Sequence, residues 1–409
     1  MSFETGLSGL LGASQSLDVI GNNIANANTT GMKSSTVDFS NLVAASLGAG
    51  GASNAAGIGV TVAEVAQNFT QGNINVTNNN LDVAINGNGF FTVKQASGNT
   101  AYTRDGSFQL DKNGYLITTT GSNVMGYAST TPGGALDKST LVPLQLPTTA
   151  PVAASATQNI TAAFNLDASA PVATTTTSPT QYATSLTVYD SQGNPITQNF
   201  FFVKSAADTW DAYTTAAAAT TAVQTSTPAG VFQMAFNTSG TLASVTPSPA
   251  TVTVTSPNTN IGTFSVAVDV SSVTQYGTNF GVSSLSQDGY TSGDLTSVSI
   301  DPSGNITSHY SNGQTQSNDQ IQLTTFRNVQ GLEPLSGGEF LQTYASGAPI
   351  TSAPNVGNVG ALQAGALEQS NVDLTSELVN MMTAQRDYQA NAQTIKTQDQ
   401  VMSTLVNLR

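Results

Sequence analysis

The chain has 409 residues, enough for two or three domains, and only 8% of them are charged, about a third of the ~25% usual in globular proteins. Acidic residues outnumber basic ones by 24 to 10, and no basic residue lies between Lys204 and Arg327, which excludes a nucleic-acid groove there. The absence of cysteine and the single histidine, His309, exclude disulfides, thiolate metal sites and paired-histidine metal sites.

The first predicted element is an amphipathic helix over residues 3–27. Apolar side chains recur in it every seven residues, with a second row beside them: Phe3, Leu10, Leu17 and Ile24, flanked by Leu7, Ala13, Ile20 and Ala27. Four glycines interrupt the pattern, and each costs ~1 kcal/mol relative to alanine in a helix interior. We therefore expect this helix to need packing against another element.

A loop rich in asparagine and glycine ends this helix and carries the most specific motif of the chain. The motif runs LDVIGNNIAN over residues 17–26, followed by Thr30-Gly31 and Lys33-Ser34. Its distinctive positions are Gly21, Asn22, Asn23, Ala25, Asn26, Thr30 and Gly31. Residues 31–75 then predict an extended connector with a short strand at Val60, Val62 and Val65.

From Leu81 the hydrophobic period becomes two, which predicts strands over 81–85, 89–93, 102–110 and 115–118. An Asn-Gly turn at 111–114 predicts a hairpin between the last two. The Gly-Asn-Gly at 87–89 is interpreted as a turn, because no βαβ unit surrounds it as a nucleotide-binding loop requires.

Residues 128–181 are rich in Thr, Ala, Ser and Pro and predict a linker with edge segments. A hairpin over 186–203 follows, then strands at 251–254 and 264–268, with aromatic residues such as Trp210 for a core. Short strands at this spacing favour a β-sandwich or barrel. Strands at 295–300, 306–310 and 321–326 precede a Gly- and Pro-rich run over 329–361.

The last predicted element is a long helix over residues 371–409. Leu374, Met381, Tyr388, Ile395 and Met402 are seven residues apart, and Leu378, Ala392 and Leu405 lie beside them. The two terminal helices share this period. We expect them to pair with each other, in one globule, or with copies of themselves in an assembly.

Few residues of the sequence are candidates for catalysis or metal binding. His309 lies on a predicted strand, and a strand residue of structural role is favoured over a catalytic base. Asp288, Asp294, Asp301 and Asp319 follow turns and do not match a twelve-residue Ca²⁺ loop. No catalytic residue, cofactor or metal is expected, so the chain is not predicted to be an enzyme.

Both termini resemble the bacterial flagellar rod and hook family. The N-terminal motif matches, and so do GALEQSNVDL at 365–374, AQRDYQANAQ at 384–393, and the pieces Gly-Phe-Phe at 89–91 and YTRDGSF at 102–108. The resemblance implies a mainly β fold with α-helical termini and nested β-domains. Terminal helices would occupy 1–30 and 372–409, connectors 31–75 and 356–371, a first β-domain 76–147 and 285–355, and an inserted outer β-domain 148–284.

The resemblance also implies a structural subunit that polymerises into a curved tube transmitting torque from rod to filament. The large insert favours the hook over the distal rod or the hook–filament junction; a secreted β-rich adhesin is a further alternative. Partners would be copies of itself, the distal rod protein, the hook-cap protein, the junction protein and the flagellar type III export apparatus. Neither binding to nucleic acid nor insertion into a membrane is expected. We expect export without a cleaved signal peptide, because residues 1–32 lack the basic start and the apolar block of such a peptide.

Overall fold

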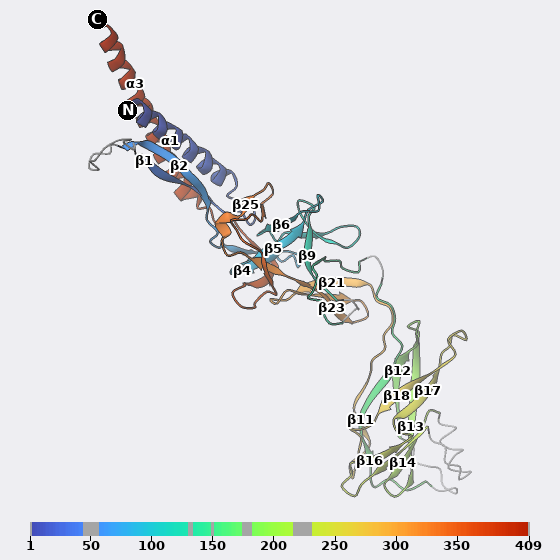
Figure 1. The fold of residues 1–409 in the computed structure, drawn as a ribbon. Helices are drawn as coiled ribbons and strands as arrows, with labels where there is room; N and C mark the ends of the chain where they lie inside the picture. The colour runs from blue at the N-terminus through green and yellow to red at the C-terminus, as the bar shows by residue number, and fades with distance from the viewer. Residues whose placement is uncertain are drawn as a thin grey trace. The chain divides into compact units, whose positions relative to one another are not determined.

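The structure, a computed structural model, describes residues 2–43, 57–129, 134–148, 151–173, 182–215 and 231–407. It is mainly β with a helix near each end of the chain, which confirms the predicted fold class (Figure 1). The chain divides into two compact units. The first comprises 1–149, 297–309 and 315–409, and the second comprises 150–296 and 310–314. No helix of the described ranges is long and apolar enough to cross a membrane.

The two terminal helices of the first unit pair with each other. Helix α1 (Ser2–Ala25) and helix α3 (Leu374–Asn407) run antiparallel, since Gly6 lies against Ile395, Gly9 against Asn391, and Asn23 bonds to Glu377 (Figure 1). Asp373 begins α3 by accepting hydrogen bonds from the N–H groups of Thr375 and Ser376. With 34 residues against 24, α3 is the longer helix by about 15 Å.

A long hairpin covers another face of α1. Strands β1 (Ser35–Val43) and β2 (Gly57–Gln67) pair antiparallel, and an added Cβ at Gly12 would lie 3.0 Å from the ring of Phe39. Ser8 Oγ accepts a hydrogen bond from the N–H of Val60. Only one short strand was expected in this connector. β1 was not predicted, because its apolar and polar residues do not alternate regularly. Residues 44–56 lie outside the described ranges.

The rest of the first unit is β-structure. Its main sheet has the order β21-β22-β23-β9-β5-β6-β26-β25, with β7, β8, β10, β24 and β27 joined to it, while β28 pairs with β4 and β29 with β3. A 3-10 helix, η1 (Val329–Gly331), precedes β25. The bounds are β3 Ile74–Val76, β4 Val83–Asn86, β5 Phe90–Lys94, β6 Thr100–Thr103, β7 Phe108–Leu110, β8 Leu116–Thr118, β9 Asn123–Ala128, β10 Val142–Pro143, β21 Leu295–Ile300, β22 Asn305–Tyr310, β23 Thr315–Ile321, β24 Leu323–Thr325, β25 Glu333–Pro334, β26 Glu339–Leu341, β27 Ile350–Ser352, β28 Ala361–Ala364 and β29 Ala366–Glu368.

The second unit is a sandwich of two five-stranded sheets, one of the two architectures predicted. One sheet has the order β17-β18-β11-β19, with β20 on β11, and the other β12-β13-β14-β15-β16. The bounds are β11 Asn159–Asp167, β12 Tyr182–Tyr189, β13 Pro195–Ala206, β14 Thr209–Tyr213, β15 Phe232–Phe236, β16 Leu242–Thr246, β17 Ala250–Thr255, β18 Thr263–Asp269, β19 Thr274–Tyr276 and β20 Gly281–Gln287. One core of buried residues fills the space between the sheets, with Trp210 fully buried in it.

The linker predicted over 128–181 is wrong where it includes β11. Ile160, Ala162, Phe164 and Leu166 alternate along this strand and all are buried in the sandwich core. The alternation was present in the sequence, but the surrounding Thr, Ala and Pro residues obscured it. The nested domain boundaries and the placement of the inserted domain on the outside of a tube stay predictions.

Candidate functional site

Two of the four glycines of α1, Gly6 and Gly9, lie in the contact between the terminal helices. An added Cβ would lie 3.1 Å from Ile395 at Gly6 and within 2.9 Å of the Asn391 side chain at Gly9. The same glycines that weaken α1 as an isolated helix therefore allow α3 to approach closely. Ile395, predicted as a contact between subunits, packs within its own chain.

Many of the predicted helix contacts remain accessible in the single chain. Phe3, Leu7, Leu374, Leu378, Tyr388 and Met402 are exposed, and so are Leu11, Val379, Met382 and Val401, which the prediction omitted. The other predicted positions are half-buried: Leu10, Leu17, Ile20, Ile24, Met381, Ala392 and Ile395. The side chain of Leu405 lies outside what the structure describes. That these residues bind neighbouring subunits stays a prediction.

The motif after α1 joins three elements through Asn23, which is 1% exposed. Its amide donates to the Ser35 carbonyl (2.8 Å) and to Glu377 Oε1 (3.1 Å), and its Oδ1 accepts from the Ser35 N–H (2.9 Å). Asn23 thus links α1 to both β1 and α3. Asn26 donates to the Asn22 carbonyl and closes the last turn. Gly21 and Thr30 are half-buried and Ala25 is exposed.

Gly31 is required by its position. Its φ is +70°, and an added Cβ would lie 2.6 Å from the backbone nitrogen of Asp105. Its N–H donates to the carbonyl of Glu368 (2.8 Å). The motif therefore meets the YTRDGSF stretch and the C-terminal motif at one point.

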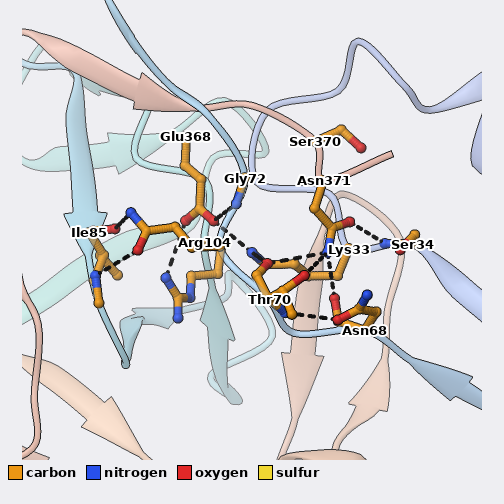
Figure 2. A network of polar contacts seen from close by, with 12 residues as sticks. Lys33, Ser34, Asn68, Thr70, Gly72, Ile85, Arg104, Glu368, Ser370 and Asn371 are labelled. Carbon is orange, nitrogen blue, oxygen red and sulfur yellow. Dashed lines mark hydrogen bonds and ion pairs between the residues drawn. The ribbon is translucent and has the colours of Figure 1, made fainter. Parts of the chain in front are cut away.

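A buried polar junction, formed by Glu368, Lys33 and Arg104, lies at this point (Figure 2). Glu368 Oε1 accepts from Lys33 Nζ (2.6 Å) and from the Gly72 N–H (2.9 Å), and its Oε2 accepts from Arg104 (3.2 Å). Lys33 Nζ also donates to the Thr70 carbonyl (2.7 Å). All three side chains are at least 96% buried, so the contacts replace hydration that the charges have lost.

One carboxylate in this junction balances two cations. Burial lowers the pKa of Lys33, while the adjacent Glu368 counteracts that effect. Burial likewise lowers the pKa of Arg104, again opposed by Glu368. Arg104 Nε has no hydrogen-bond partner among the described residues, and the guanidinium lies 5.3 Å from the ring centroid of Phe90, which offers a partial substitute. Glu368 is therefore the residue on which both cations depend.

Asn371 extends the junction towards α3 (Figure 2). Its Oδ1 accepts from the Ser34 N–H (2.7 Å), and its amide donates to the carbonyls of Asn68 (2.7 Å) and Thr70 (3.2 Å). The segment that leads into α3 is thus bonded to the segments that follow α1 and β2. The junction fixes both helices at the same end of their pair.

In the sequence, the residues of the junction stand out only as members of longer motifs, with no pattern that indicates a role for them. Glu368, Lys33, Arg104 and Asn371 come from segments up to 338 positions apart, so no local pattern joins them. Scarcity was the one usable signal: the chain has only ten basic residues, and three of them, Lys33, Arg104 and Arg386, lie in the motifs quoted above.

His309 and the aspartates that were weighed as catalytic or Ca²⁺-binding residues lie on or beside strands. His309 Nε2 lies 3.0 Å from Ser299 Oγ on the neighbouring strand. Asp288 accepts hydrogen bonds from the backbone N–H groups of Gln158 and Asn159, whereas Asp301 accepts one from Ser303 within its own turn. Asp319 is buried. No group of three or more metal-ligating side chains occurs among the described residues. An open hollow of about 720 Å³ lies between the motif loop and residues 334–340, with Asp18 on its wall.

Four stretches match known families. Residues 3–33 match "Flagella basal body rod protein", 84–177 "Flagellar hook protein FlgE/F/G D1 domain", 159–290 "Flagellar basal body protein FlaE D2 domain" and 363–408 "Flagellar basal body rod FlgEFG protein C-terminal". These matches include both terminal helices, the buried junction and most of the sandwich.

Relatives match over the full length. The flagellar hook protein FlgE of Salmonella typhimurium is 40% identical and that of Escherichia coli 39%, each alignment covering 100% of both chains. That of Treponema pallidum is 32% identical, covering 100% of this chain and 99% of its own. The crystal structure of Helicobacter pylori flagellar hook protein FlgE2 covers 72% of this chain and 100% of its own with a TM-score of 0.52 and 12% identity, a likeness of fold.

Proposed function

Because this chain belongs to the flagellar hook protein family, we propose that it polymerises through its terminal helices into the tube of the bacterial flagellar hook. It is a structural subunit, and its place is the external hook and basal body of the flagellum. The alternatives of a rod subunit, a junction subunit or an adhesin are not favoured, because the full-length relatives are hook proteins.

The observation that carries the proposal is the incomplete cover of the terminal helices. Phe3, Leu11, Leu378, Met382 and Met402 are each between 47% and 61% exposed, although α1 packs against α3 and the β1–β2 hairpin. Apolar surface of this extent on neighbouring elements marks a site of association. Neighbouring subunits would bury it, and the buried junction would hold the two helices in the required arrangement.

The sandwich supplies the outer part of the tube in this proposal. Residues 150–296 contain seven aspartates and one basic residue, Lys204, which is buried and donates to the carbonyls of Ala168 and Ala170. Two copies of this unit therefore have no exposed cation with which to form ion pairs. Contacts without ion pairs can slide at low cost, as a curved tube that transmits torque requires. Charge pairs engineered into such contacts should raise the bending stiffness of the tube.

Finer assignments follow from the family alone. The subunit would meet the distal rod protein at one end of the hook and the junction protein at the other. It would assemble under the hook-cap protein after passage through the flagellar type III export apparatus. These partners are part of the proposal.

The proposal is tested by removing the helices. Purified full-length protein should form curved tubes in electron micrographs. A chain lacking residues 1–30 and 372–409 should keep its β-structure by circular dichroism, because the junction residues remain, and should sediment as a monomer. Tubes formed by the truncated chain would contradict the assigned role of the helices.

A further inference from the structure

Each terminal helix has a stripe of side chains that are exposed in the described chain, and on α3 the exposed surface extends beyond that stripe. On α1, the outer stripe consists of exposed residues three or four positions apart: Glu4, Leu7, Leu11, Gln15, Asp18, Asn22 and Ala25. On α3, the outer stripe consists of exposed residues with the same spacing: Val379, Met382, Arg386, Gln389, Gln393, Lys396 and Gln400. Side chains with this spacing lie along one face of a helix.

Both outer stripes face away from the contacts within the chain. The residues of α3 that meet α1 include Glu377, Asn391 and Ile395. A rotation of 100° per residue places Arg386 about 180° and Lys396 about 100° round the helix from Glu377, so neither side chain lies in that contact. On α1, Gly6 and Gly9 face α3 while Ser8 and Gly12 face the hairpin. The outer stripe of α1 is the face that remains.

The two stripes have opposite charge. The outer stripe of α1 carries two carboxylates, Glu4 and Asp18, and no cation, whereas the outer stripe of α3 carries two cations, Arg386 and Lys396, and no carboxylate. None of these four side chains forms an ion pair with a described residue. Asp387 and Asp399, the other exposed charges of α3, lie off the stripe.

The spacing of the charges is also compatible. Glu4 and Asp18 are about 21 Å apart along α1, and Arg386 and Lys396 are about 15 Å apart along α3. An antiparallel contact therefore brings Asp18 to Arg386 and Glu4 to Lys396 with an axial offset of about 3 Å at each pair, within the reach of long side chains. Leu7 then lies beside Gln393 and Leu11 beside Gln389, over the aliphatic parts of these side chains.

We propose that the outer stripe of α3 binds the outer stripe of α1 on a second copy of this chain, with Arg386 against Asp18 and Lys396 against Glu4. This rests on the proposed function and adds the residues that set the register between neighbours. In a chain with net charge −14, two cations on one face of one helix direct a neighbour's acidic helix to that face. The partner is a second copy because the complementary stripe belongs to the same sequence.

Reversing the charges tests the proposal on the full chain. Arg386→Glu with Lys396→Glu places like charges opposite one another, and the critical concentration for polymerisation should rise roughly tenfold or more. Adding Asp18→Lys and Glu4→Lys restores opposite signs and should return the critical concentration to within about threefold of the original. Sedimentation measures polymer yield, and electron microscopy checks tube shape.

A matched control separates this contact from net charge. Lys94→Glu with Lys112→Glu, exposed positions in the β-structure, changes the net charge by the same amount and should leave the critical concentration nearly unchanged. Circular dichroism of the monomers checks that the variants fold. The proposed pairing is wrong if the Arg386/Lys396 double variant polymerises like the control. It is also wrong if the quadruple variant keeps the raised critical concentration of the double variant. In both cases the assignment to the hook stands. If the unmodified chain forms no polymer, the proposed function fails and this inference with it.

Discussion

The sandwich and the terminal helix pair show opposite ways of using apolar side chains. The sandwich encloses a core in which Trp210, Met234 and Val252 are fully buried, so it has what a domain needs to fold alone. The two helices are in contact at Gly6 and Gly9, and most of their large apolar side chains stay partly accessible. The first region has a closed core of its own, whereas the second is held by the buried junction at one end and leaves apolar side chains exposed along its length.

Removing the charge of Glu368 should have the largest effect on this contrast. Glu368→Gln leaves Lys33 and Arg104 buried without a counterion, which should destabilise the first unit by about 3–5 kcal/mol. Urea unfolding followed by far-ultraviolet circular dichroism should show an early transition. Fluorescence of Trp210, the chain's one tryptophan, reports the sandwich and should not move.

The exposed Glu333→Gln is the matched control and should change neither signal. If Glu368→Gln shifts the unfolding transition of Trp210 together with that of the first unit, the sandwich does not unfold independently of the first unit.

Gly31→Ala should have the next largest effect. The substitution combines a left-handed backbone with a clash against the backbone of Asp105, and we expect a loss of about 2–4 kcal/mol. Gly357→Ala shares the positive φ but has no atom within 4 Å, so it should lose only about 1 kcal/mol. Equal losses in urea unfolding would mean that the close approach at Gly31 contributes nothing.

Acid should act on the sandwich through Asp190. Burial would raise the pKa of this carboxyl, but hydrogen bonds from Asn194, Ser256 and Gln192 lower it to about 2. The folded pKa lies below the unfolded one, so this stabilisation is complete above about pH 4 and is lost as the pH falls towards 2.

Asp190→Asn should therefore lower the free energy of unfolding of the sandwich by about 1–3 kcal/mol at pH 7 and by less at pH 2. Fluorescence of Trp210 measures the unfolding. A difference between variant and original that is the same at both pH values would contradict this explanation.

Asp319 should give the smallest effect, with the opposite sign. Burial raises its pKa to about 6, and its Oδ2 has no hydrogen-bond partner. The folded state then holds a proton that the unfolded state has released, so stability falls as the pH rises from about 4 through 6.

Asp319→Asn mimics the protonated acid and should stabilise the first unit by about 1 kcal/mol at pH 7 but not at pH 4. Exposed Asp387→Asn is the control and should do nothing at either pH. Thermal unfolding measures both variants, and a stabilisation at pH 4 as large as that at pH 7 would exclude the buried charge as its cause.

The sequence predicted what depends on local periodicity. The terminal helices, the hairpin of β12 and β13 and the sandwich follow from spacing and turn residues close together in the chain. The buried junction could not be predicted, because Glu368 meets Lys33 and Arg104 only after the chain has closed on itself. The glycines of α1 were interpreted as weaknesses because their use depends on Ile395 and Asn391, which lie 382 or more positions away.

The sandwich also has a base that closes on itself. Val152 bridges to Gly293 and Ser155 to Tyr290, so the two ends of residues 150–296 are paired with each other by isolated bridges. An insertion whose ends are paired at its base can lengthen, shorten or diverge without moving the segments that flank it. Natural selection can therefore change the sandwich in length and sequence while the helices and the buried junction keep theirs.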